Sequence, residues 1–95
     1  MVGVLTNERA NKLCDLLADL EETRDRLRRR GGRLPENELH ANELLVADVN
    51  MNRTQAQRYF NEFGVTGAIQ DPGFDEWFKR ASRQVRELRG VSDLL

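Results

Sequence analysis

The stretch ELLVADVNMNRTQAQRYF, residues 43–60, decides the fold that the sequence predicts. An apolar run is followed by the break NMN and then by a polar segment with a few apolar positions. Asparagine is one of the few residues other than glycine that tolerate a left-handed backbone, so Asn50 is suited to a tight turn. Asn52 followed by Gln55 is typical of a helix start. We therefore expect one helix to end near Val49 and another to begin at Asn52.

The rest of the chain is divided in the same way by glycine and proline. Leucines recur at intervals of three, four and seven residues before Gly31, and an aromatic-rich stripe follows Pro72. No segment shows the sustained alternation of apolar and polar residues that indicates a half-buried strand. The expected fold is all-α with about four helices, at residues 6–30, 35–49, 52–63 and 72–89.

Length and composition limit the organisation of the chain. Its 95 residues fit one helical domain, residues 1–95, in which residues 1–33 form the long first helix and residues 71–90 the C-terminal helix. Charged residues make up 33% and aromatic residues 6%, which indicates a charged protein with a small core. A chain of this size gains apolar burial by self-association, so a homodimer is expected.

Groups that support catalysis or metal binding are sparse. The chain has one cysteine, Cys14, and one histidine, His40, whereas a structural zinc site needs four ligands. A single cysteine also excludes an internal disulfide and favours a reducing compartment. The longest apolar runs are too short to span a membrane. We expect a cytoplasmic protein that is not an enzyme, with no catalytic residues, no metal site, no cofactor and no membrane contact.

Residues 43–63 resemble the helix-turn-helix of small prokaryotic, phage and plasmid DNA-binding proteins. In that motif two helices meet across a short turn, and apolar residues of both pack inward. This sequence departs from the pattern at Val46, where close approach of the helices favours alanine. The resemblance implies a sequence-specific DNA-binding protein, either a dimeric transcriptional regulator or a phage or plasmid DNA-handling factor, that reads the major groove of double-stranded DNA with helix 52–63.

The outer side of that helix has side chains suited to base edges and phosphates. An arginine side chain can form two hydrogen bonds to guanine, and glutamine and asparagine can do the same with adenine. The candidate DNA contacts are Asn52, Arg53, Thr54, Gln57, Arg58 and Asn61. Two further basic segments flank it in the sequence. Lys79, Arg83 and Arg86 share one helical face and are candidate phosphate contacts, whereas the six arginines of residues 24–33 have acidic neighbours at helical spacing and are interpreted as solubilising charge.

The leucine stripe of the first helix is longer than a small core needs, so it is a candidate dimer interface. This interface would consist of Leu13, Leu16, Leu17, Leu20 and Leu27. The aromatic patch of Phe74, Trp77 and Phe78 is an equally suitable dimer element. Both surfaces also support an alternative function, a helical protein-interaction module such as an adaptor or inhibitor that does not bind DNA. The acid-poor segment 52–63 favours DNA binding, and the net charge of -1 favours the alternative.

Overall fold

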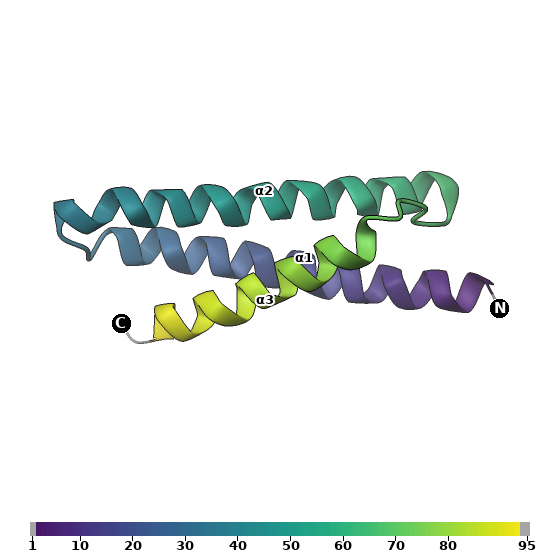
Figure 1. Ribbon diagram of the computed structural model, residues 1–95, viewed down its shortest axis with the longest axis horizontal. Helices are drawn as coiled ribbons and strands as arrows, with labels where there is room; N and C mark the ends of the chain where they lie inside the picture. Colours follow the sequence, from purple (N-terminus) through teal and green to yellow (C-terminus); the bar gives the residue numbers. More distant parts are fainter. Residues whose placement is uncertain (1, 94–95) are drawn as a thin grey trace.

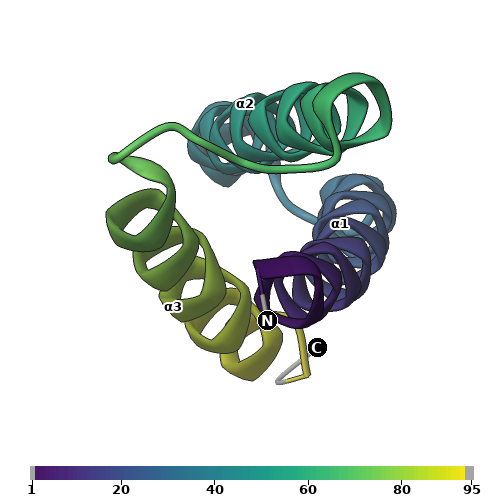
Figure 2. The ribbon, with the colours of Figure 1, turned by 90° about the vertical axis from the view of Figure 1, so that its right-hand side faces the viewer.

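The computed structural model describes residues 2–93, with the side chains of residues 8–90. Within residues 2–93 the chain forms three helices, α1 (Val2–Gly31), α2 (Glu36–Thr66) and α3 (Phe74–Asp93), and no strand. The all-α prediction is confirmed, but the predicted number of helices is wrong. The molecule measures 52 × 19 × 18 Å, and α1 and α2 lie antiparallel along its long axis while α3 crosses them obliquely (Figure 1). Viewed from one end, the three helices lie at the corners of a triangle (Figure 2).

The α1–α2 hairpin is built on two matching seven-residue repeats. Leu13, Leu20 and Leu27 on α1 have no exposed surface, and the α2 residues at the same spacing are also buried. Those α2 residues are Asn42, Val49 and Ala56. Seven residues are about two helical turns, so each set forms one stripe that faces the other helix, as in a coiled coil. α1 already begins at Val2, earlier than the predicted start at residue 6.

A proline and a glycine set the two ends of α2. Pro35 immediately precedes the helix with φ of -66° and ψ of 156°, which is the extended geometry of an N-cap position. Gly67 ends it in the left-handed conformation, with φ of 75°, and its N–H donates to the Phe63 carbonyl at 2.8 Å. Glycine adopts this conformation without a Cβ clash. The helix therefore passes through Gly64, and the predicted end at residue 63 is wrong.

The turn predicted at residues 50–52 is also wrong, because these residues lie in the interior of α2. Asn50 is in a helix with its Oδ1 accepting hydrogen bonds from Arg24 Nη1 at 3.3 Å and from Arg53 Nε at 3.2 Å. Asparagine favours turns and caps because its side chain competes for backbone hydrogen bonds. Here that side chain is occupied by two guanidinium groups. The predicted helices at residues 35–49 and 52–63 are therefore one helix, and the angled helix pair predicted for residues 43–63 is not formed.

Asn52 is held in the helix by α3. Its Oδ1 accepts from Trp77 Nε1 at 3.1 Å, and its Nδ2 donates to Gln84 Oε1 at 2.7 Å. Gln84 Nε2 in turn donates to Asp48 Oδ2 at 2.7 Å. This row of hydrogen bonds ties α3 to the middle of α2, and Asn52 acts as a tertiary contact rather than as a helix cap.

An aromatic cluster fixes the start of α3 against α2. The ring of Tyr59 lies 5.0 Å from that of Phe74, edge to face, and 5.1 Å from that of Trp77. Such pairs add to the stability gained by burying their area. Tyr59 donates its hydroxyl to Asp71 Oδ2 at 2.7 Å, just before α3. Burial first, and then the hydrogen bond and negative charge of Asp71, raise the pKa of Tyr59 to about 12.

The leucine stripe of α1 and the aromatic patch of α3 form the core of the single chain. Leu13, Leu16, Leu20 and Leu27 are at most 4% exposed, and Leu17 packs half-buried against the same core. Phe74 and Trp77 are buried and Phe78 is half-buried. The expectation that α1 leaves a surplus apolar stripe for a second copy is wrong, because α2 is long enough to cover it. No helix within residues 2–93 has the length and apolar composition to cross a membrane.

Candidate functional site

The six predicted DNA contacts of residues 52–61 do not form one surface. Asn52 faces α3, as described above, and Arg53 faces α1. Arg53 Nε bonds to Asn50, and its Nη1 lies 3.9 Å from Glu21 Oε1. These two side chains hold the helices together and are not directed outward.

The other four predicted contacts lie farther round α2. Thr54 donates its hydroxyl to the Asn50 carbonyl at 3.0 Å, and Gln57 Nε2 donates to Asn61 Oδ1 at 3.0 Å. Thr54, Arg58 and Asn61 are exposed, and Gln57 is half-buried. Arg58 is the one charged group among these four, so this part of α2 has little positive charge.

Positive charge is instead concentrated in two segments. Residues 24–33, at the end of α1 and in the loop that follows, contain six arginines and one aspartate, a net charge of +5. Residues 79–89 of α3 contain five basic groups and one glutamate, a net charge of +4. The remainder of the chain has four basic and fourteen acidic groups. The overall charge of -1 is therefore the sum of two basic segments and an acidic remainder.

The structure brings the two basic segments together at Glu22. Glu22 Oε1 pairs with Arg26 Nη2 of α1 at 2.8 Å, and Glu22 Oε2 lies 3.9 Å from Arg89 Nη2 of α3. Arg89 also pairs with Asp19 at 2.8 Å. We call the joined region the basic surface, which consists of Arg26, Arg28, Arg29, Arg30 and Arg33 with Lys79, Arg80, Arg83, Arg86 and Arg89.

Most of the basic surface is open to solvent. Arg28, Arg29 and Arg33 are exposed on the hairpin, and the cations from Lys79 to Arg86 are exposed on α3. Among the side chains that the structure describes, no acid lies within ion-pair distance of these exposed groups. The predicted phosphate contacts Lys79, Arg83 and Arg86 therefore lie in this surface. The sequence did not show that residues 24–33 lie near α3, because only the position of α3 in the fold brings the two segments together.

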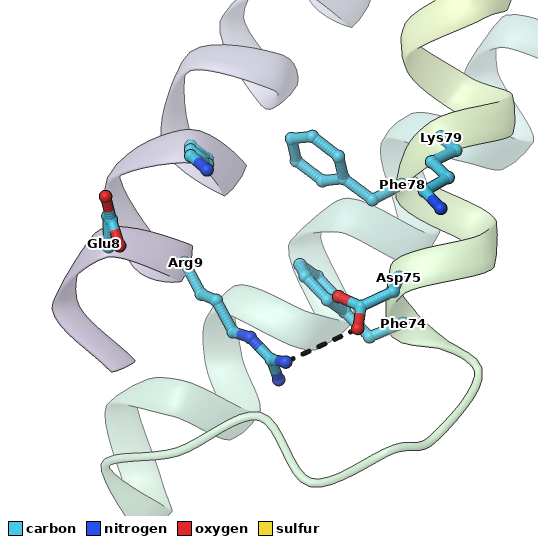
Figure 3. Close-up of a pocket in the computed structure, with 7 residues that line it drawn as sticks. Glu8, Arg9, Phe74, Asp75, Phe78 and Lys79 are labelled. Carbon is cyan, nitrogen blue, oxygen red and sulfur yellow. Dashed lines mark hydrogen bonds and ion pairs between the residues drawn. The ribbon is translucent and has the colours of Figure 1, made fainter. Parts of the chain in front are cut away.

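A groove runs between α1 and α3 and is lined in part by Lys79, Arg86 and Arg89 of the basic surface. Its first part, about 360 Å³, is lined by Phe74, Phe78 and charged residues of both helices (Figure 3). Arg9 crosses it, 3.4 Å from Asp75 Oδ2 and with its guanidinium 5.8 Å from the centre of the Phe74 ring. Because Arg9 is held by both partners, this end of the groove fastens the start of α1 to α3. A second part of about 500 Å³ reaches Arg86 and Arg89.

The single cysteine and histidine lie on different helices. Cys14 is exposed on α1, and His40 is exposed in the second turn of α2. Within the described residues, no three histidine, cysteine, aspartate or glutamate side chains are grouped so that they could hold a metal ion.

No family model, no curated protein and no solved structure matches this chain. The candidate site is therefore defined by the geometry and charge of its own residues.

Proposed function

We propose that this protein binds double-stranded DNA by contacting its phosphates with the basic surface. The observation that carries the proposal is the meeting of two basic segments at Glu22, which turns separate charge clusters into one cationic region. Arginine is well suited to this role, because its planar guanidinium bonds to two phosphate oxygens at once.

The size of the basic surface is appropriate for several phosphates. Each segment covers about 15 Å of helix at 1.5 Å per residue. Duplex DNA carries one negative charge per about 1.7 Å of its axis, so several phosphates fall within that length. Glu22 and Asp19 pair with Arg26 and Arg89 of this surface, so most of the attraction comes from its exposed cations.

Phosphate contacts favour binding that depends weakly on base sequence. Reading of bases by residues 52–61 is not part of the proposal, because Asn52 and Arg53 are occupied within the molecule and the angled helix pair is not formed. The alternative of a protein-interaction module that uses Leu13–Leu27 or the aromatic patch is not favoured either, since those side chains are mostly buried in the core.

The test is a titration of labelled random-sequence duplex DNA at several salt concentrations. The main variant replaces two exposed arginines with neutral residues of similar length, Arg29→Gln together with Arg33→Gln. We expect at least about a tenfold loss of affinity at low salt. The slope of log K against log salt should fall by about 1.8, because each lost phosphate contact contributes about 0.9.

Two control variants separate charge from other effects. Arg29→Lys with Arg33→Lys keeps the charge and should bind nearly as well as the natural sequence. Gln57→Ala with Asn61→Ala changes the predicted base contacts and should also bind normally. The proposal is wrong if the natural protein does not bind DNA at about 50 mM salt, or if the Gln57 and Asn61 variant loses binding while the Arg29→Gln, Arg33→Gln variant does not.

A further inference from the structure

α2 carries an apolar stripe that no side chain of residues 8–90 covers. Among the described side chains, the exposed large apolar residues all belong to α2. Three of them, Leu44, Met51 and Val65, are 58%, 70% and 86% exposed. They are separated by seven and fourteen residues, so they lie on one side of the helix, and the position between the last two is Arg58.

This stripe lies opposite the core. The inward positions Asn42, Val49 and Ala56 have the same spacing but are offset by two residues, which is about 200° around a helix. Ala47 and Thr54, both small and exposed, fill the intermediate positions of the outer repeat. α2 therefore has two seams of coiled-coil type. α1 fills one of them, and the other is open.

The charge along α2 indicates what fits the open seam. Its first half, residues 36–48, has four acidic groups and no lysine or arginine, whereas its second half contains Arg58, Glu62 and Arg53, which faces α1. A parallel neighbour would place acidic half beside acidic half. An antiparallel copy avoids that repulsion and places the acidic half beside the exposed Arg58, so the charges favour the antiparallel direction.

We propose that α2 of a second copy packs antiparallel along this stripe, with the two-fold axis beside Met51. In this register Arg58 lies opposite the partner's Leu44, so its methylene groups cover that side chain and its guanidinium reaches the partner's Glu43. His40 lies opposite the partner's Glu62. A shift by one heptad would set Asp48 beside the partner's Glu62, and the repulsion between these like charges disfavours it.

This dimer does not depend on the proposed function, because it uses the outer side of α2 and leaves the basic surface exposed. Failure of DNA binding leaves the dimer proposal unaffected, and a monomeric protein leaves the DNA proposal unaffected.

A cysteine cross-link tests the register directly. In a Cys14→Ser background, Met51→Cys places two thiols beside the axis, close enough for the disulfide Cα separation of about 4.4–6.8 Å. Val65→Cys is the matched control, because it is as exposed but its two copies would be about 42 Å apart at 1.5 Å per residue. We expect a rapid, nearly complete cross-link for Met51→Cys and none for Val65→Cys. Cross-linking of both to the same extent would overturn the proposal.

The charge pairing has its own test, measured as molecular mass by light scattering over a range of concentrations. Arg58→Glu should raise the dimer dissociation constant by about tenfold, because it sets like charges against Glu43 at two symmetric places. Adding Glu43→Arg should restore the dimer. Circular dichroism checks that each variant is folded. The proposal is contradicted if the natural protein stays monomeric at all concentrations. It is also contradicted if the Arg58→Glu variant dimerises as tightly as the natural protein.

Discussion

The two halves of the α1–α2 hairpin differ in how they are held together. In the half that α3 crosses, the buried side chains are apolar or aromatic, with Trp77 and Tyr59 at the centre. In the other half, residues 23–46, which we call the hairpin end, two of the three buried side chains, Thr23 and Asn42, are polar. The half with a third helix therefore provides most of the stability, and the hairpin end is a weakly packed extension that carries the arginines.

The two halves also differ in their buried polar atoms that lack a hydrogen-bond partner. The buried side-chain atoms without a hydrogen-bond partner among the described residues are Thr23 Oγ1, Arg30 Nε and Asn42 Oδ1. All three lie in the hairpin end. Asn42 satisfies only its Nδ2, which donates to the Leu27 carbonyl at 2.8 Å. Each buried unsatisfied group costs about 1–3 kcal/mol. The hairpin end is therefore packed less completely than the half that α3 crosses.

The largest expected effect is in the three-helix half. Trp77→Ala removes a buried ring, its contacts with Tyr59 and its hydrogen bond to Asn52, and should lower the free energy of unfolding by about 3–5 kcal/mol. Urea unfolding followed by circular dichroism measures it. Asn11→Ala, on the exposed side of α1, is the control and should change the stability by less than about 0.5 kcal/mol. Equal losses from both variants would remove the distinction between core and surface.

The next largest effect is a pH dependence of the free energy of unfolding, which arises in the same half of the molecule. Because the pKa of Tyr59 is raised to about 12, its neutral form is favoured in the folded state. The stability from this group is complete below the unfolded pKa of about 10 and is lost as pH rises toward 12. Tyr59 is the single tyrosine of the sequence, so the absorbance of tyrosinate measures the titration of this residue without a contribution from any other. Tyr59→Phe should remove this part of the alkaline loss, and titration of Tyr59 near pH 10 would contradict the assignment.

The smallest expected effect is in the hairpin end, where a substitution should increase the free energy of unfolding rather than lower it. Asn42→Leu replaces a half-satisfied buried amide with an apolar side chain of the same branched shape, and should raise the free energy of unfolding by about 1 kcal/mol. Amide hydrogen exchange in residues 24–46 should slow in this variant. A loss of stability would show that Asn42 holds the register of the hairpin, as a buried asparagine does in some coiled coils.

Helix content and most of the core were predictable from the sequence, because the leucine spacing of α1 and the aromatic stripe of α3 are strong periodic signals. The predicted break in α2 was not correct. Asn50 and Asn52 have the local preferences of a turn, and only their distant partners Arg24 and Trp77 explain why they are helical. The basic surface depends in the same way on Glu22 meeting Arg89, residues far apart in the sequence. Local pattern predicts elements, and it does not predict which side chains from different elements will meet.

Our main proposal is that the basic surface binds DNA and the middle of α2 does not. NMR of the labelled protein with increasing duplex DNA tests it most directly, through the backbone amides and the arginine side-chain Nε–H signals. We expect the largest chemical-shift changes in residues 24–33 and 79–89, with residues 52–63 almost unchanged. Changes centred on residues 52–63, with the arginines of residues 24–33 unaffected, would contradict it.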